Sequence, residues 1–229
     1  MAHTKRIAVG MGKKPVWLTT PAPGTHPEEK SITLLSLLRD KLQYAKDANE
    51  AKKIIYGGML LVDGKIRTDY KFGVGIMDII SIPGADKHFR VMPGKKGVLI
   101  IKEIPADEAK IKLLKIINKS IIPGGLVQLN LHDGTNIVVS KEGDENPVAY
   151  NTKDTLLVDL KDKKIISVIE FNIGNTGLVI RGRHSGEIGK IEEILKGTIS
   201  RKSLTTIGEL QTLTDYVFMI GENESLISL

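Results

Sequence analysis

Residues 59–69 read MLLVDGKIRTD, and this stretch decides the fold of the front of the chain. The apolar run from Met59 to Val62 predicts a strand, and Asp63-Gly64 is a dipeptide typical of tight hairpin turns. The chain then returns over Lys65 to Thr68, so the stretch predicts a β-hairpin. A third strand is predicted over residues 76–82, where apolar residues recur.

Two helices are predicted ahead of the hairpin. Ser31 is suited to cap the first helix, whose apolar residues recur at helical steps: Leu34, Leu35, Leu38, Leu42 and Ala45. The second helix begins after Asp47, which has capping-box spacing to Glu50, and it ends at Gly57-Gly58. Its inward residues are predicted to be Ala48, Ala51 and Ile55. The order is therefore helix, helix, hairpin.

Basic residues fall on the flank of the first helix, on the second helix and on the hairpin: Arg39, Lys46, Lys52, Lys53, Lys65 and Arg67. Any one of them is as readily a solvated surface charge as an RNA contact. Together they can line one surface with cations near the spacing of backbone phosphates, which is how sequence-independent affinity for RNA arises. We therefore predict that this surface binds RNA.

The net charge of +6 is unevenly divided along the chain. Residues 1–98 hold 17 Lys and Arg against 9 Asp and Glu, a charge of +8, whereas residues 99–229 hold 16 against 18, a charge of −2. A polyanion is therefore expected at the N-terminal part. Aromatic residues make up only 4% of the chain, which argues against stacking on a single strand and favours a structured nucleic acid held by its phosphates and shape.

Residues 1–30 show neither helical nor strand periodicity and are predicted to form an extended basic arm. Its RNA contacts are predicted to be four early cations and the single tryptophan of the chain: Lys5, Arg6, Lys13, Lys14 and Trp17. Such an arm would become ordered on a phosphate surface. The alternative is a solubilising terminus, although the large apolar Trp17 favours an arm that packs on a partner.

The middle of the chain is predicted to be mostly β with one helix. A strand over residues 98–104 is followed by a helix from Pro105 to about Asn118, with Ala109, Leu113, Ile117 and Ile121 facing inward. On this helix Lys112, Lys115 and Lys119 would form an exposed stripe. Two hairpins are then predicted, over residues 127–139 and 156–169.

Residues 178–191 predict two strands of a small barrel joined by a loop that Gly182, Gly186 and Gly189 shape. Four side chains of this region are predicted RNA contacts: Arg181, Arg183, His184 and Lys190. A nucleotide phosphate cradle is the other possibility for such a loop, but the GxxxxGK[ST] pattern is absent. After Ser203 the chain is acidic, and three-residue apolar steps suggest a helix through Leu204, Ile207, Leu210 and Leu213.

Catalytic and metal-binding residue patterns are missing from the sequence. There is no cysteine, and the five histidines do not occur at HExxH or HxxxH spacing. His132-Asp133 could be half of a catalytic triad, but a hairpin turn at Asp133-Gly134 explains it better. We predict that the protein is not an enzyme and that it binds no metal, cofactor or small-molecule substrate. The sequence has no membrane-length apolar run and no secretory signal, so a cytoplasmic location is expected.

Four stretches of the front half carry a resemblance to a known family: LLSLLRDKL at 34–42, NEAK at 49–52, VDGKIRTD at 62–69 and MDIISI at 77–82. They resemble the S4 RNA-binding module, in the version of the archaeal and eukaryotic ribosomal protein S4e family. The resemblance continues through His88-Phe89-Arg90, His132-Asp133-Gly134 and residues 165–171, and residues 170–191 resemble a KOW motif.

This resemblance implies a non-catalytic structural component of the small ribosomal subunit, which binds and stabilises folded small-subunit rRNA beside neighbouring ribosomal proteins. It implies an α+β fold in four parts: a basic arm (1–30), an S4-like RNA-binding domain (31–85), a central mostly β domain (86–170) and a small KOW-like, SH3-like β-barrel with an acidic C-terminal segment (171–229).

Two other kinds of protein use such modules. The alternative function is a stand-alone RNA-binding factor in translation quality control or transcription elongation. Some RNA-modifying enzymes also carry the S4 module, but residues 83–170 are too short for their catalytic domain.

Overall fold

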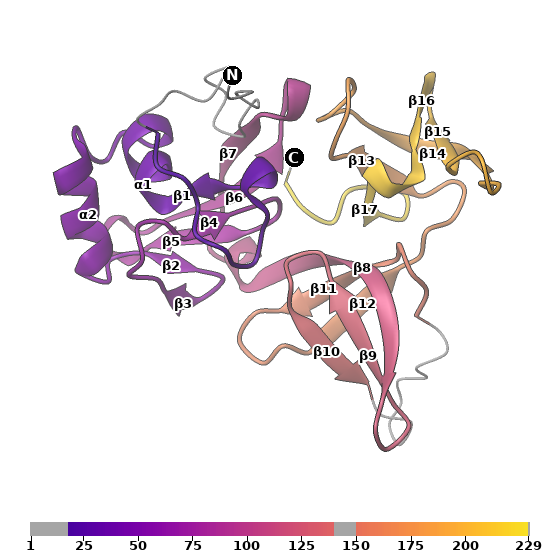
Figure 1. Cartoon of the computed structure of the whole chain (residues 1–229), viewed down its shortest axis with the longest axis horizontal. Coiled ribbons are helices and arrows are strands. Elements are labelled where there is room, and N and C mark those ends of the chain that lie inside the picture. The colour runs from indigo at the N-terminus through magenta and orange to yellow at the C-terminus, as the bar shows by residue number, and fades with distance from the viewer. Residues whose placement is uncertain (1–17, 140–149, 229) are drawn as a thin grey trace. The chain divides into compact units, whose positions relative to one another are not determined.

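The computed structural model describes residues 18–139 and 150–228, and the chain divides into two compact units, residues 1–112 (unit 1) and 113–229 (unit 2) (Figure 1). Strands predominate and helices are few, so the predicted α+β class is confirmed. The predicted contacts of the arm lie outside the described residues: Lys5, Arg6, Lys13, Lys14 and Trp17.

An antiparallel sheet of five strands, in the order β3-β2-β5-β6-β7, forms the centre of unit 1. Its strands are β2 (Leu61–Val62), β3 (Lys65–Ile66), β5 (Ile79–Ile82), β6 (Lys87–Pro93) and β7 (Leu99–Ile104). The predicted hairpin is confirmed, because Asp63 and Gly64 have φ of 49° and 73°, the left-handed backbone that this two-residue turn requires. Since β5 pairs with β6, the sheet continues across residue 85, where the sequence predicts a domain boundary.

The first helix begins two residues later than predicted, because Ile32 and Thr33 form strand β1 (Ile32–Thr33) and pair with β4 (Gly73–Val74). Thr33 rather than Ser31 caps α1 (Leu34–Ser36), since its Oγ1 accepts a hydrogen bond from the Ser36 N–H at 3.2 Å. Ser31 is buried and donates its hydroxyl to the Pro27 carbonyl instead. The helix continues as the π-helical turn η2 (Leu37–Lys41) and ends before Ala45.

The second helix is confirmed as α2 (Ala48–Tyr56). The Asp47 carboxylate accepts the backbone N–H groups of Asn49 and Glu50, both at 2.8 Å, as an N-cap should. Ala51 and Ile55 are fully buried. Three 3-10 turns complete the elements of unit 1 up to β7: η1 (Glu28–Lys30), η3 (Pro83–Ala85) and η4 (Lys95–Gly97).

The helix predicted over residues 105–118 is wrong. The structure has the 3-10 turn η5 (Glu108–Lys110) and then the long strand β8 (Ile111–Ile122). Isoleucine is frequent in this segment and prefers strands, and the neighbouring strand β9 (Leu126–Leu131) supplies the pairing that sequence periodicity does not reveal. Of the residues predicted to face inward, Leu113 is buried, but Ile117 and Ile121 are 60% and 82% exposed.

The exposed lysine stripe predicted on that helix is therefore also wrong. Lys112 and Lys115 are buried, and the Lys119 ammonium donates to the Tyr150 carbonyl at 2.6 Å. The Lys115 ammonium donates to the carbonyls of Asp215 and Val217, at 3.1 and 2.6 Å. Carbonyl oxygens thus satisfy two of these lysines inside unit 2.

Lys112 belongs to a buried charge cluster in unit 1. Its ammonium donates to the Asp63 and Asp78 carboxylates, both at 2.7 Å, and His26 Nε2 lies 2.9 Å from the other Asp78 oxygen. Burial alone would raise the pKa of the Asp78 carboxyl, but the charge of the Lys112 ammonium and the hydrogen bond with His26 outweigh it and hold that pKa well below its usual value. Gly75 is needed beside this cluster, because a Cβ there would collide with the His26 ring.

Unit 2 consists of two five-stranded sheets, ordered β10-β9-β8-β11-β12 and β16-β15-β14-β13-β17. Both predicted hairpins are confirmed, in β9 with β10 (Asn136–Val139) and in β11 (Thr155–Asp159) with β12 (Ile165–Ile169). The second sheet holds β13 (Thr176–Val179), β14 (Ile188–Leu195), β15 (Leu204–Ile207), β16 (Leu210–Leu213) and, after the turn η6 (Thr214–Tyr216), β17 (Val217–Gly221).

The helix suggested after Ser203 is wrong as well. Leu204 to Leu213 form the antiparallel pair β15 and β16, which turns at Gly208-Glu209. Gly208 has a φ of 55°, which favours glycine and interrupts any helical period. The three-residue apolar steps in this segment came from two short strands separated by a turn.

Candidate nucleic-acid interface

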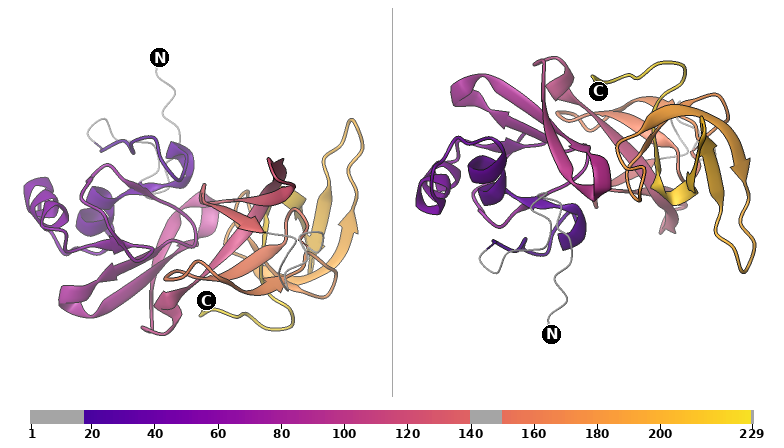
Figure 2. Two further views of the ribbon diagram at one scale, coloured as in Figure 1. Left: turned by 90° about the horizontal axis from the view of Figure 1, so that it is seen from below. Right: turned by 90° about the horizontal axis from the view of Figure 1, so that it is seen from above.

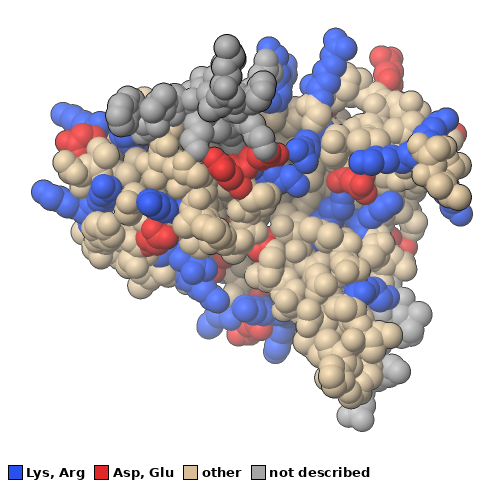
Figure 3. Space-filling view, viewed as in Figure 1, with Lys and Arg blue, Asp and Glu red and all other residues tan. Residues whose placement is uncertain are grey.

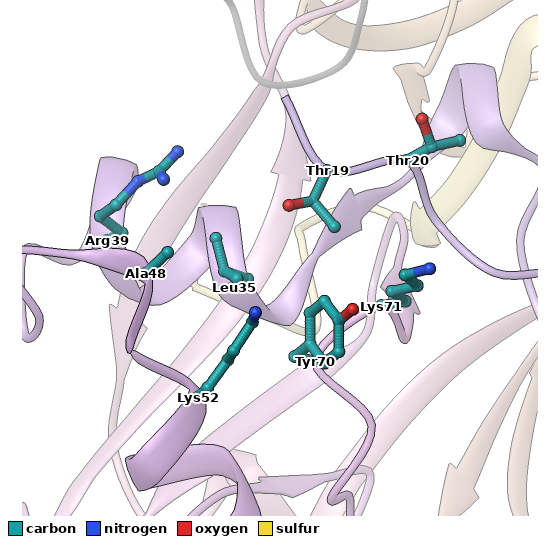
Figure 4. A pocket seen from close by; sticks show the side chains of 8 residues that line it. All are labelled: Thr19, Thr20, Leu35, Arg39, Ala48, Lys52, Tyr70 and Lys71. Atoms are coloured by element: carbon teal, nitrogen blue, oxygen red, sulfur yellow. The ribbon is translucent and has the colours of Figure 1, made fainter. Parts of the chain in front are cut away.

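A pocket of about 390 Å³ opens in unit 1 where η2, α2 and the chain after the β2–β3 hairpin meet. Figure 4 shows the side chains that line it: Thr19, Thr20, Leu35, Arg39, Ala48, Lys52, Tyr70 and Lys71. Three of these are cations and none is acidic. The described surface of the pocket is therefore suited to a negatively charged ligand.

Local structure explains how these side chains come together. The Asp47 cap sets the start of α2, so that Ala48 and Lys52, four residues apart, face the same way. The Asp69 carboxylate accepts the Lys71 N–H at 2.9 Å, and the Leu35 N–H donates to the Tyr70 carbonyl at 3.2 Å. This backbone bond ties the turn that carries Tyr70 to α1.

Tyr70 is the aromatic centre of the pocket. The Lys52 ammonium lies 4.7 Å from the centroid of its ring and the Lys71 ammonium 5.8 Å. The Tyr56 ring lies edge-on to the Tyr70 ring, with 6.2 Å between the two ring centroids. Arg39 is held beside the pocket by a two-pronged ion pair with Asp40, at 2.7 and 3.0 Å. A phosphate can be held by such cations, and the phenol ring adds a surface for a sugar or a base.

The structure brings Arg39 and Lys52 into one pocket, but the other predicted contacts of unit 1 lie outside it. Lys46, Lys53 and Lys65 are exposed. Arg67 is half-buried, with its guanidinium 4.5 Å from the centre of the Phe72 ring and its buried Nε without a hydrogen bond to the described residues. Lys and Arg side chains surround α2 in the space-filling view (Figure 3).

Sequence reasoning missed Tyr70 and Lys71. Both follow directly after the hairpin string VDGKIRTD, and a tyrosine next to a lysine at the end of a basic hairpin was the available signal. Their convergence with Lys52, which lies 18 residues earlier, depends on how α2 packs and is not visible in the sequence.

The second candidate region is the loop between β13 and β14 in unit 2. Gly182 and Gly186 have φ of 92° and 91°, so two glycines shape the turn as predicted. Gly189 instead lies within β14, where a Cβ would come within 2.8 Å of the Ile207 side chain. Its role is close packing between strands and not loop geometry.

Of the predicted contacts in this region, Arg181, Arg183 and Lys190 are exposed, and Lys190 lies in β14 and not in the loop. Arg181 lies over the Tyr216 ring, 5.9 Å from its centroid, and His184 Nδ1 lies 3.4 Å from a Glu187 carboxylate oxygen. The region therefore presents three exposed cations, one of which contacts Tyr216, and it places His184 beside Glu187.

Comparison with known proteins identifies the family. The small ribosomal subunit protein eS4 of Ignicoccus hospitalis is 42% identical over 240 residues, which cover 99% of this chain and 94% of that protein. The chain belongs to the ribosomal protein S4e family. The model of ribosomal family S4e matches residues 85–165, so the predicted family is confirmed.

Other S4e relatives agree in sequence and in fold. The eS4 protein of Methanocaldococcus jannaschii is 40% identical, over 99% of this chain and 97% of its own. The crystal structure of the 30S ribosomal protein S4e from Thermoplasma acidophilum aligns with a TM-score of 0.72 at 34% identity, covering 84% of this chain and 96% of that one. The similarity thus spans both units.

Two further observations concern the described residues only. Within 18–139 and 150–228, no three His, Cys, Asp or Glu side chains gather in a way that could hold a metal ion. In the same part of the chain, no helix has the length and apolar character needed to span a membrane.

Proposed function

We propose that this protein is a structural component of the small ribosomal subunit that binds and stabilises folded small-subunit rRNA. The observation that carries the proposal is the pocket that Arg39, Lys52, Lys71 and Tyr70 line and whose lining contains no acidic residue. Cations placed in this way neutralise backbone phosphates and release their counterions, which favours binding. Membership of the S4e family supports the same role, and no catalytic step is part of it.

We infer that the chain uses separate modules for this binding. The helices α1, η2 and α2 with the β2–β3 hairpin would act as an S4-type module, and the β13–β14 loop as a KOW motif. The arm would add contacts from its early cations and Trp17. The four-part division of the chain stays a prediction, as do neighbouring ribosomal proteins as partners and the cytoplasmic ribosome as location.

Sedimentation tests the proposed function. Epitope-tagged protein from growing cells should co-sediment with small subunits at close to one copy each and remain bound through a moderate salt wash. A stand-alone RNA-binding factor would be substoichiometric and would wash off. If most of the protein were free of ribosomes during growth, the proposal would be wrong.

Lys65 and Arg67 are expected to behave differently on replacement by alanine. Lys65 is exposed, so its removal should leave the melting temperature unchanged and lower the log–log salt slope of binding to transcribed small-subunit rRNA by about 0.7–0.9. Arg67→Ala should in addition lower the melting temperature, because it removes a cation–π contact with Phe72 worth about 0.5–1 kcal/mol. An unchanged slope in the Lys65 variant would mean that the hairpin faces away from RNA.

A further inference from the structure

A second basic pocket, of about 600 Å³, lies in unit 2 at the end of the β14–β15 hairpin. Its charged and aromatic lining consists of Lys153, Phe171, Lys196, Arg201, Lys202 and Asp215. It shares no lining residue with the loop between β13 and β14. Neither the sequence patterns nor the family resemblance pointed to it.

The four cations of this pocket are not neutralised within the described part of the chain. Lys196, Arg201 and Lys202 are exposed, and Lys153 is half-buried. None of them forms an ion pair with a described carboxylate, and Asp215 is the one acidic side chain in the lining. Their mutual repulsion is relieved when a polyanion binds between them.

The hairpin that carries three of these cations projects from the rest of unit 2 (Figure 2). Its tip is an ordered turn, in which Thr198 and Arg201 exchange backbone hydrogen bonds of 2.8 and 3.3 Å. Gly197 is packed so closely that a Cβ would lie 2.8 Å from the Ser203 nitrogen. The hydrogen-bonded turn fixes the backbone from which these side chains extend, so that little backbone freedom is lost on binding.

Ile199 lies at the tip of this turn and is fully exposed. Basic residues flank it on both sides in the sequence KGTISRK, residues 196–202. At the right of the space-filling view, where this hairpin lies, Lys and Arg side chains gather around uncharged surface (Figure 3). An apolar tip between cations suits a nucleic acid, since it can rest against a sugar or base while the cations contact phosphates.

The opposite wall of the pocket is fixed by Asp154. Its buried carboxylate accepts the N–H groups of Asn151 and Phe171, both at 2.9 Å. Between these anchors Lys153 adopts a φ of 82°, which is a left-handed backbone conformation that is costly for any residue other than glycine. Lys153 and Phe171 are thereby held beside the hairpin, and the pocket is preformed.

We infer that this pocket is a second phosphate-binding site for folded RNA, in which Lys153, Lys196, Arg201 and Lys202 hold the backbone and Ile199 contacts a sugar or base. The inference rests on the proposed function, that the protein binds rRNA. RNA is favoured over an acidic protein because the site combines clustered cations with an aromatic side chain and an exposed apolar tip.

The test compares two triple variants of the full chain in which the same number of charges is removed. The site variant carries Lys196→Gln, Arg201→Gln and Lys202→Gln. The control variant carries Lys161→Gln, Lys163→Gln and Lys164→Gln, in the exposed β11–β12 turn of the same unit. Binding to transcribed small-subunit rRNA is measured over a range of salt concentrations, together with hydroxyl-radical footprints of the RNA.

The site variant should lower the log–log salt slope by about 2 or more, because each phosphate that is no longer neutralised reduces the slope by about 0.7–0.9, while the control changes it little. The RNA footprint of the site variant should also lack protection at a defined set of nucleotides. Ile199→Ser should weaken binding several-fold and leave the slope unchanged, because an apolar contact releases no counterions.

Other outcomes separate the two proposals. If the site variant binds like wild type while replacing Arg39, Lys52 and Lys71 weakens binding, the protein binds rRNA and the second site is wrong. If the site and control variants weakened RNA binding equally, general surface charge would explain the effect, and the inference would be overturned. If the wild-type protein does not bind rRNA, the proposed function itself is wrong. Loss of an acidic protein partner with an unchanged RNA footprint would assign the site to that partner instead.

Discussion

Asp78→Asn is expected to lower the free energy of unfolding of unit 1 by about 3–5 kcal/mol, the usual cost of removing one partner from a buried ion pair. Asp78 is 2% exposed and accepts hydrogen bonds from Lys112 and from the Gly75 N–H, at 2.7 and 2.8 Å. Without its charge, the buried ammonium loses one of the two carboxylates to which it donates at 2.7 Å. Chemical denaturation followed by hydrogen exchange of unit 1 amides would measure the destabilisation.

The matched control is Asp107→Asn, which breaks the exposed ion pair between Asp107 and Lys110. Surface pairs of this kind contribute about 0–1 kcal/mol, so this variant should unfold almost like wild type. Similar destabilisation in the two variants would mean that the cluster around Lys112 is solvated and not a buried centre.

Acid should reduce the difference between wild type and Asp78→Asn. Because the pKa of Asp78 is held below its usual value, its charge stabilises the folded state fully above the unfolded-state pKa of about 3.9. That contribution is lost as pH falls from about 4 through the lower folded-state pKa. The two proteins should therefore differ most at neutral pH and converge in strong acid. A difference that stays constant from pH 7 to pH 2 would contradict the role given to this carboxylate.

Replacing the three cations of the unit 1 pocket by glutamine is expected to have the largest effect on RNA binding. Glutamine keeps much of each side-chain stem, while the charges and with them the cation–π contacts with Tyr70 are removed. Removal of three phosphate contacts lowers the log–log salt slope by about 2.1–2.7, which weakens binding about 100- to 500-fold at 0.1 M salt if the affinity at 1 M is unchanged. Filter binding with transcribed small-subunit rRNA over a range of salt concentrations measures this.

Lys95, Lys96 and Lys110 form the matched control, because they are exposed in the same unit and outside the pocket. Their triple glutamine variant should shift the affinity only slightly. If it weakened binding as much as the pocket variant, general attraction by the positive N-terminal half would explain the binding, and the pocket would have no special role.

Local signals in the sequence predicted much of the fold of unit 1. Asp63-Gly64 specifies its turn because both residues tolerate positive φ, and Asp47 caps α2 through bonds to residues two and three positions later. In β8, by contrast, a proline and apolar four-residue steps imitated a helix. The strand forms because β9 offers it a partner, and pairing of that kind does not appear in the periodicity of one segment.

The candidate sites were predicted less completely than the fold, for the same physical reason. Arg39 and Lys52 were found because they lie on predicted helices with other basic residues. Lys112 was misplaced because its carboxylate partners are 49 and 34 residues away, and nothing local marks a lysine for burial. The pocket in unit 2 was missed because its two walls, at Lys153 and at residues 196–202, belong to different sheets and meet only in the folded unit.

The position of Lys112 also has a consequence for folding during protein synthesis. Protein synthesis runs from the N-terminus, so Asp63 and Asp78 emerge well before the lysine that lies between them in the folded state. Until residue 112 is available, closing unit 1 would enclose two neighbouring carboxylates without the ammonium that donates to both. The first unit is thus expected to complete its core only as the strand leading into the second unit is being made, which sets the order of events in the nascent chain.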